Sequence, residues 1–425
     1  MKRYFLFLTL LWGCVSLCAQ TLEQCRSMAR EHYPAIKQYD LINKAEQYNV
    51  SNAARAWIPQ IMLSGQATYQ SATPTYPEKL NAMLAASGLE MAGMRNDQYK
   101  IALDINQNIW DGGVSKAGKM VAEAEAAEQR SKTDVTLYDL QTRVDNIYFG
   151  ILLLEQKHAQ TEAMIALLES NLSRMRSQYK NGVARQADVD VIEAELLGAR
   201  QALTQVDASL GSYRQMLELF IGKQLTDAKL PMPAMVEVSD RTVNRPELAL
   251  FDAQTSLLDA QKKTINTAVT PRFSLFAQGY YGYPGMDMFK SMTSSDWTLN
   301  GLVGVRMQWN ISGFYTHKNN LEKIANAQEN IAVQRDIFLF NTELKTTQED
   351  AEIARLKKVI ADDARIVELR KNVRLAAESQ LENNVIDATD LLRKITDETT
   401  AKLNQSTHEI ELLQAVYRLK NTLNQ

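Results

Sequence analysis

The chain is poor in cysteine and in the motifs that enzymes use. It has three cysteines, and Cys14 and Cys18 lie within the first twenty residues, so that Cys25 is the thiol left to the rest of the chain. This excludes an internal disulfide framework and a cysteine-ligated metal cluster. The four histidines are scattered, and no H-E-x-x-H, P-loop, nucleophile-elbow or dinucleotide-binding motif occurs. We therefore expect neither an enzyme nor a bound cofactor.

A strong charge of either sign is also absent. The formal net charge is −3, which gives no reason to expect a nucleic-acid partner. Apolar residues make up 45% of the chain and charged residues 23%, a balance typical of a folded protein rather than a disordered one.

No run of about 18 apolar residues occurs, which a membrane-spanning helix would need. The apolar run Tyr4–Leu17 follows Lys2-Arg3 and is followed by Cys18-Ala19-Gln20, a pattern typical of a signal peptide. We expect residues 1–19 to be removed, which leaves 20–425 as the mature protein. A buried N-terminal helix is one alternative. Another is lipoprotein cleavage with an acylated Cys14.

What the sequence does contain is a duplication. Pro34 and Pro246 are 212 residues apart, as are Pro59 and Pro271. The segments 107–112 and 308–313 align at an offset of 201, and the segments 177–183 and 379–385 at an offset of 202. Such a period indicates a duplicated fold unit rather than a solenoid of short repeats. We place repeat 1 at about 21–221, a linker at 222–244 and repeat 2 at about 245–425, and we expect one interlocked body.

Each repeat contains long helical patterns. Between Gly113 and Tyr179 there is no proline, and apolar residues follow the 3,4 spacing of a coiled coil. At a rise of 1.5 Å per residue, about 65 residues form a rod of roughly 100 Å. The second repeat shows the pattern less clearly from about Lys318 to Asn383 and from Thr389 to Leu423.

Some residues interrupt these patterns. Arg370 and Arg374 fall near the seam, which is explained by a looser interface or by a face that lines water. We expect His158 to be a packed core residue rather than a ligand. Close helix packing is expected at three glycines inside the helical pattern: Gly150, Gly198 and Gly211.

Four segments alternate between apolar and polar residues, at about 60–71, 99–110, 272–283 and 296–310. Aromatic residues cluster at both ends of these segments. One apolar face, one polar face and aromatic ends are typical of membrane barrel strands, although an ordinary soluble sheet remains an alternative.

Four strands cannot close a barrel, and open strand edges are not tolerated in lipid. Single-chain barrels begin at eight strands, and an eight-stranded interior is filled by side chains. Three copies supply twelve strands and leave a lumen. We therefore predict a homotrimer that shares one 12-stranded β-barrel.

Together these features resemble the TolC-type outer-membrane efflux family (outer membrane factors) over about residues 21–425. The resemblance is carried by the proline junctions at Pro59 and Pro271, by the strand-to-helix junction 110–113, and by the segments 179–183 and 188–189. It implies a fold that is mainly α with membrane β, in which long helices continue the barrel as a periplasmic α-barrel.

The resemblance also implies the function and the partners. The protein would be the outer-membrane exit duct of a tripartite efflux system in a Gram-negative bacterium, with a large periplasmic portion and passive export. Its partners would be a periplasmic adaptor (membrane fusion) protein and an inner-membrane pump of the RND or ABC type.

In this family the helical tips, here about 179–189 and 381–391, form the closable mouth of the channel. The candidate gate and tip residues are Asp390, Asp188, Gly182, Asn384, Asp387, Tyr179 and Leu381. Three copies of Asp390 around one constriction would favour cations. Adaptor hairpins should dock around Gly182 and Asn384.

Three positions depart from the family pattern. Leu381 stands where an aromatic residue is usual, Ile386 where a basic lock residue is familiar, and Arg393 where a second acidic ring would be. The gating contacts therefore do not carry over intact. Asp188 and Asp390 are equally explained as carboxylates at helix N-termini.

Other functions remain open. A duct for type I protein secretion shares the whole architecture, and a secreted structural coiled-coil protein explains the helices but not the strands. Metal efflux is a further alternative, because thioether sulfur suits soft ions. The two strand loops carry six methionines: Met83, Met91, Met94, Met286, Met288 and Met292.

Overall fold

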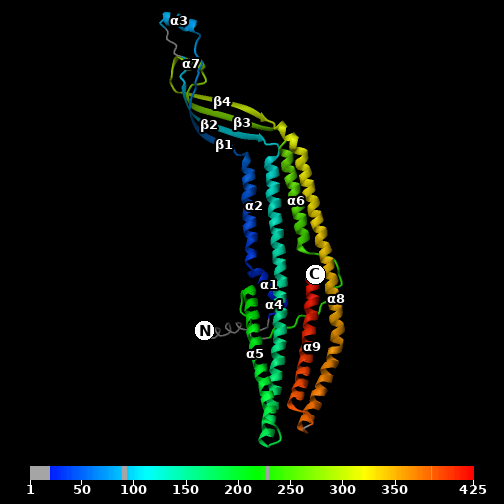
Figure 1. The fold of residues 1–425 in the computed structure, drawn as a ribbon. Helices are drawn as coiled ribbons and strands as arrows, with labels where there is room; N and C mark the ends of the chain where they lie inside the picture. The colour runs from blue at the N-terminus through cyan, green and yellow to red at the C-terminus, as the bar shows by residue number, and fades with distance from the viewer. Residues whose placement is uncertain (1–19, 89–92, 226–228, 384) are drawn as a thin grey trace, which may run out of the picture. The chain divides into compact units, whose positions relative to one another are not determined.

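The computed structural model describes residues 20–88, 93–225, 229–383 and 385–425 (Figure 1). The expected signal peptide 1–19, with Cys14, lies outside the described residues. In the first repeat the elements are α1 (Leu22–His32), α2 (Gln38–Ala54), β1 (Gln60–Tyr69), α3 (Glu78–Ala86), β2 (Asp97–Trp110), α4 (Val114–Lys180) and α5 (Gln186–Ile221). In the second they are α6 (Pro246–Thr267), β3 (Arg272–Tyr283), α7 (Met288–Thr293), β4 (Thr298–Gln308), α8 (Phe314–Glu382) and α9 (Ala388–Leu423).

The contacts within the chain divide it into two compact units rather than the single body that the duplication suggested. Among the described residues, the helical unit consists of 20–39, Ser131–Leu250 and Gln334–Gln425. The sheet unit consists of Asp40–Arg130 and Phe251–Val333. Each unit contains segments of both repeats, so that the sequence repeats are not the units that pack.

The four strands of the sheet unit form one antiparallel sheet in the order β1-β2-β3-β4. The two repeats meet where β2 pairs with β3, with Leu103 opposite Gly279. The strands keep the alternation that the sequence shows, because successive side chains in a strand point to opposite faces. The expectation of a mainly helical fold with four strands is confirmed.

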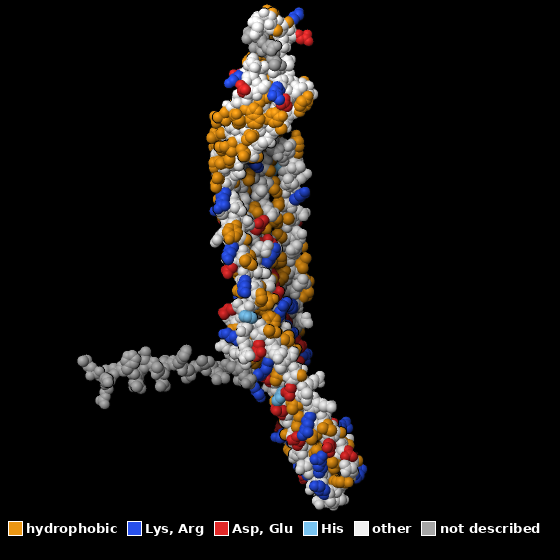
Figure 2. All heavy atoms as spheres, turned by 90° about the vertical axis from the view of Figure 1, so that its left-hand side faces the viewer, with side chains coloured by type: hydrophobic (Ala, Val, Ile, Leu, Met, Phe, Trp, Pro, Cys, Tyr) orange, Lys and Arg blue, Asp and Glu red, His pale blue; other side chains and the backbone are white. Residues whose placement is uncertain are grey.

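One face of this sheet is apolar and exposed. Leu299 is 81% exposed, Val303 is 81% exposed and Leu63 is 73% exposed. At one end of this face the Trp297 ring lies 6.0 Å from the Tyr99 ring and 5.3 Å from the Tyr281 ring, measured between centroids. Figure 2 shows hydrophobic side chains gathered at the level of the sheet. A soluble sheet buries its apolar face, and this sheet does not bury its own within the chain.

The junction from β2 to α4 requires glycine. Gly112 has a φ of +68°, and a Cβ at this position would lie 2.2 Å from Oγ1 of Thr270. The Asp111 carboxylate accepts hydrogen bonds from the amides of Gly113 (2.9 Å) and Ser115 (2.7 Å) at the start of α4. Burial alone would raise the pKa of Asp111, but the bonds from Ser115 and Gly113 lower it. The sharp turn is therefore built into the 110–113 motif.

The helical unit contains two helical hairpins. The α4–α5 hairpin turns after Lys180, and the α8–α9 hairpin turns after Glu382 (Figure 1). The helix α4 continues through the interruption of its seam at His158, since tertiary packing rather than an unbroken seam holds it. No helix in the described residues is long and apolar enough to cross a membrane.

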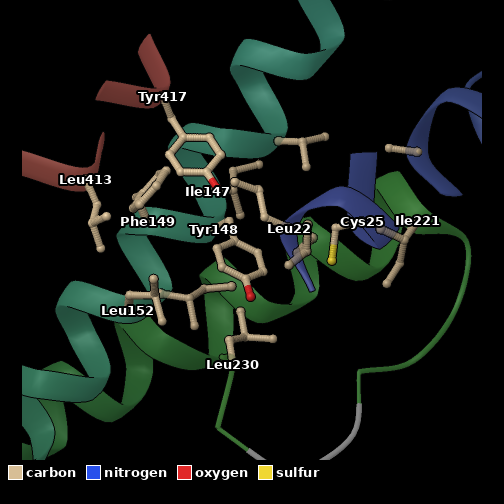
Figure 3. Close-up of a cluster of buried hydrophobic side chains, with 14 of the residues drawn as sticks. Leu22, Cys25, Ile147, Tyr148, Phe149, Leu152, Ile221, Leu230, Leu413 and Tyr417 are labelled. Atoms are coloured by element: carbon tan, nitrogen blue, oxygen red, sulfur yellow. The ribbon is translucent and has the colours of Figure 1, made fainter. Parts of the chain in front are cut away.

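The main core of the helical unit joins α1, α4, α5 and α9 (Figure 3). Tyr148 and Phe149 are fully buried, and the Phe149 ring lies 5.8 Å from the Tyr417 ring between centroids. Cys25 is also fully buried here, and burial raises the pKa of its thiol to about 12. Full burial of one such large apolar side chain is worth about 1.5–3 kcal/mol. The remaining thiol is therefore a packing residue and not a reactive one.

A buried ion pair between Arg26 and Asp145 links the helices of this core. Nε of Arg26 donates to Oδ1 of Asp145 (2.7 Å), and Nη2 donates to Oδ2 (2.6 Å). The guanidinium also donates to Oδ1 of Asn421 (3.2 Å) and lies over the Tyr417 ring. Helices α1, α4 and α9 are joined in this way at one point. Both charges are satisfied, as burial requires.

The linker between the repeats packs along the helical unit. The Tyr148 hydroxyl donates to the carbonyl of Pro231 (2.8 Å), and the Tyr417 hydroxyl donates to that of Ala234 (3.2 Å). Leu230 is buried in the main core. At the other end of the linker the Asn244 amide donates to the carbonyl of Leu423 (2.9 Å). The linker is thus tied to α4 and α9.

Candidate functional site

The two helical tips of the helical unit lie next to each other and enclose a groove of about 550 Å³. Of the candidate tip residues, Asp188, Leu381, Asp387 and Asp390 all line it. Tyr179 and Gly182 lie on the first tip and are exposed, but they are not among the lining residues. Asn384 lies outside the described residues. The tertiary structure therefore gathers four of the predicted residues at one place.

Both tips end their first helix in the same way. At the first tip the Val183 amide donates to the carbonyl of Gln178 (2.9 Å), and at the second tip Val385 donates to Gln380 (2.9 Å). These bonds satisfy carbonyls that the helix end leaves free. Gly182 adopts a left-handed φ of +73°, which explains the glycine at the first turn.

The two tips start their second helix differently. In α5 the Asp188 carboxylate reaches back to the amide of Arg185 (3.1 Å) and pairs with the Arg185 guanidinium, with 2.9 Å from Nη2 to Oδ1. In α9 the N-cap is Asp387, whose Oδ1 accepts from the amide of Asp390 (2.9 Å). Arg185 and Asp387 stand at equivalent positions of the two repeats. A basic residue in one repeat thus corresponds to an acidic one in the other.

Because of this difference, the aspartate in the first turn of the second helix follows a basic N-cap residue at the first tip and an acidic one at the second. The hydrogen bond from Arg185 lowers the pKa of Asp188, whose side chain is only 15% exposed. The Asp390 residue is exposed, and within the described residues its carboxylate has no ion-pair partner. Asp188 is therefore a helix N-terminal carboxylate with a local partner, whereas Asp390 presents its charge to solvent.

A small core supports the tips from below. It joins residues of all four helices, and Leu168, Ile192 and Ile395 in it are fully buried. Leu381 and Ile386, two of the three departures from the family pattern, pack against this core and are half-buried. The third, Arg393, is exposed. An aliphatic pair in the core thus occupies the positions where aromatic and basic residues are usual.

The two arginines near the α8 seam form ion pairs with α9. The Arg370 guanidinium bonds Asp397 (2.8 Å). Arg374 contacts both Glu378 and Glu398, and Lys402 adds a bond of 2.7 Å to Glu398. Burial would raise the pKa of Glu398, but Lys402 and Arg374 lower it. The irregular seam is therefore explained by a charged network between α8 and α9.

Inside the helices the expectations are wrong at His158, Gly198 and Gly211, whereas the expectation at Gly150 is correct. His158 is not a packed core residue, because its ring is 29% exposed and contacts the carboxylates of Glu162 (3.3 Å) and Asp207 (3.1 Å). Gly150 does allow close packing, since a Cβ there would lie 2.5 Å from the Tyr213 ring. Gly198 and Gly211 face open space in this chain, with no atom within 4 Å of a Cβ.

The structure also shows an exposed apolar stripe on α8 that was not predicted from the sequence. Ile337, Phe340 and Leu344 of α8 are 54%, 61% and 55% exposed. Further along α8, Ile366 and Leu369 are also exposed. The 3,4 spacing of the first three is that of a coiled-coil seam, and it was the signal available in the sequence. Within the described chain, more than half of the surface of each of these three residues is exposed.

No metal site is evident. In the described part of the chain, no group of three or more His, Cys, Asp or Glu residues could hold a metal ion. Among the loop methionines, Met94 is buried and Met83 and Met288 are exposed, whereas Met91 lies outside the described residues.

Comparisons with solved structures identify the fold. The fold is that of outer-membrane channels. VceC of Vibrio cholerae is 14% identical, with a TM-score of 0.67, and the match covers 95% of this chain and 94% of that one. CmeC of Campylobacter jejuni is 10% identical, with a TM-score of 0.66 and coverages of 96% and 86%. The open state of MtrE of Neisseria gonorrhoeae is 13% identical, with a TM-score of 0.65 and coverages of 95% and 88%.

A sequence match covers the first repeat. Residues 25–223 match the family described as "Outer membrane efflux protein". No curated protein matches the chain. The resemblance to the TolC-type family is therefore confirmed. The family comprises transport channels, so the expectation that the protein is not an enzyme is confirmed as well.

Proposed function

We propose that this protein forms a homotrimeric duct whose three sheets close one 12-stranded barrel in the outer membrane of a Gram-negative bacterium. The observation that carries the proposal is the open sheet: β1 and β4 each have one edge without a strand partner in the described chain, and the face between these edges is apolar. Unpaired edges are excluded from lipid, so the missing partners must come from other copies.

The exposed stripe on α8 supports the same assembly. Ile337, Phe340 and Leu344 have the spacing of a seam, yet each is more than half exposed in the described chain. A neighbouring copy would cover them and continue the barrel as a helical tunnel on the periplasmic side. The α8 stripe and the strand edges would then meet the neighbouring copies together.

The stripe gives a direct test. Phe340→Glu should convert the trimer to monomers, because it places a charge in the proposed interface, whereas Lys345→Glu, at an exposed position on another face of α8, should leave the trimer intact. The measurement is the mass of the detergent-extracted protein by light scattering, together with its recovery in the outer-membrane fraction. A wild-type protein that is monomeric, or that never fractionates with the outer membrane, would contradict the proposal.

The duct would serve a tripartite efflux system and export small molecules passively. The tip groove is where an adaptor hairpin would dock, and Val385 on its rim is 69% exposed. An inner-membrane pump of the RND or ABC type would supply the energy and select the cargo. A duct for protein secretion shares this geometry, and the cargo separates the two.

Docking at the groove can be tested separately from assembly. Val385→Asp should abolish efflux-dependent drug resistance and co-purification of the adaptor while leaving trimer mass and channel conductance unchanged. The control is Lys180→Asp, also at an exposed tip position but outside the groove lining. Full resistance in the Val385→Asp strain would remove the groove from the proposal.

A further inference from the structure

The polar face of the sheet has an excess of positive charge. Strand alternation and register place three basic side chains and one acidic side chain on it, a net charge of +2: Lys100, Arg272, Arg306 and Asp104. Within the described residues, none of the three basic side chains forms an ion pair. The charge is therefore available to a ligand.

Two of these cations lie over aromatic rings of the same face. Nζ of Lys100 is 4.6 Å from the centroid of the Tyr280 ring, and Cζ of Arg306 is 4.6 Å from that of the Phe276 ring. Gly304 lies opposite Phe276, and a Cβ there would come within 2.9 Å of the ring. The glycine thus leaves the ring room to lie against β4 toward Arg306.

Asp104, the acidic residue of this face, accepts a hydrogen bond from the side-chain amide of Gln278. Nζ of Lys100 donates to Oε1 of Gln278 (3.1 Å), and Nε2 of Gln278 donates to Oδ1 of Asp104 (2.5 Å). A hollow of about 260 Å³ lies beside Lys100 and Tyr280, and Gln66 and Gln98 also line it. Cation, ring and amide donors therefore surround one small space.

We propose that this face binds organic anions that carry an aromatic body, as cargo passing through the barrel. The inference rests on the proposed trimeric duct, in which this face lines the lumen. The anionic group would pair with Lys100 or Arg306, and the aromatic body would contact the ring beside that cation. A cation held over a ring keeps donors free for an incoming anion, while the ring adds apolar contact area.

The charge is tested by ion selectivity. The full-length mature protein is reconstituted in planar bilayers, and the reversal potential is measured across a KCl gradient near 0.1 M, where the screening length is about 10 Å. Lys100→Gln and Arg306→Gln should shift the permeability ratio toward potassium, and Asp104→Asn should shift it toward chloride. If these variants conduct but their reversal potentials equal that of the wild type, the inference is overturned while the duct stands.

The aromatic part is tested by channel block. Naphthalene-2-sulfonate should reduce the chloride current of the wild-type channel, whereas methanesulfonate, an anion without a ring, should not. The double variant Phe276→Leu/Tyr280→Leu keeps every charge and should lose the block but retain the selectivity. Equal block by naphthylmethylammonium, or unchanged block in the double variant, would overturn the inference. A protein that forms no trimer and no conductance would instead contradict the proposed duct.

Discussion

Arg185 and Asp188 form an ion pair within the first turn of α5, with 2.9 Å between Nη2 and Oδ1. The equivalent positions of the second repeat hold Asp387 and Asp390. The duplicated tips have thus diverged in charge while their helix-ending hydrogen bonds have stayed the same. In a trimer, first tips, whose Asp188 is paired with Arg185, would alternate around the mouth with second tips, which carry Asp387 and Asp390.

The divergence predicts unequal effects on ion selectivity. Asp390→Ala should reduce the cation selectivity of the channel, because it removes an exposed charge from each copy in the proposed trimer. Asp188→Ala should change selectivity less, since Arg185 already offsets that carboxylate, and should mainly cost about 0.3–1 kcal/mol through the lost interaction with the helix N-terminus. The measurement is the reversal potential in planar bilayers. Unchanged selectivity in Asp390→Ala would remove that residue from the gate.

The apolar sheet face predicts which substitutions the membrane rejects. Val303→Arg places a charge on the exposed apolar face and should cost roughly 2–4 kcal/mol near the middle of the bilayer. Asn300→Arg lies on the opposite face of the same strand and should cost much less. Recovery of heat-modifiable trimer from outer membranes measures the difference. Equal recovery of both variants would mean that the Val303 face does not contact lipid.

The buried pair of Arg26 and Asp145 predicts a large loss of stability. Asp145→Ala leaves the guanidinium buried without its partner, which should cost about 3–5 kcal/mol. The double variant Arg26→Met/Asp145→Leu should recover most of that loss, because it removes both charges and keeps the volume. Thermal unfolding of the purified protein, followed by circular dichroism, reports both. A double variant as unstable as Asp145→Ala would show that packing, and not the stranded charge, causes the loss.

Glu349 predicts a pH dependence of stability. Its side chain is 5% exposed, and burial raises its pKa, with Oε1 bonded to Thr422 and Oε2 without a partner. An acid whose pKa is raised on folding contributes its full stability below the unfolded value of 4.5, and this contribution is lost as the pH rises through the folded value.

The measurement is the thermal midpoint of the purified protein between pH 4 and pH 8. The wild type should lose stability as the pH rises from about 4.5, a typical glutamate pKa. Glu349→Gln does not titrate and should show a flatter profile. Glu352→Gln, at a neighbouring half-buried position of α8, serves as the control and should keep the wild-type decline, since the Glu352 pKa is lowered by its bond to Arg355. Identical profiles for the wild type and Glu349→Gln would contradict the assignment.

Much of the fold could be predicted because its periodicities are long. The third expected strand, 272–283, has the bounds of β3, and the others differ by two residues or fewer at each end. The positions of the two tips followed from the repeat, whereas the gating role of their residues, which the family resemblance implied, stays a prediction. The α8 stripe was missed because Phe340 and Leu344 look like ordinary core positions in sequence. The surroundings of His158 were missed because two carboxylates, one on another helix, turn a seam position into a polar one.

The sequence by itself determined the local elements and the faces of the strands. Apolar residues recur every two residues in the strands and every 3.5 residues in the long helices, and both periods can be read directly from the sequence. Its paired junctions and tips also carried the resemblance to the TolC-type family. Only the tertiary structure decided which distant residues meet: Arg26 with Asp145, and Lys100 with the Tyr280 ring. Such contacts depend on register and packing between separate elements, which one-dimensional periodicity does not encode.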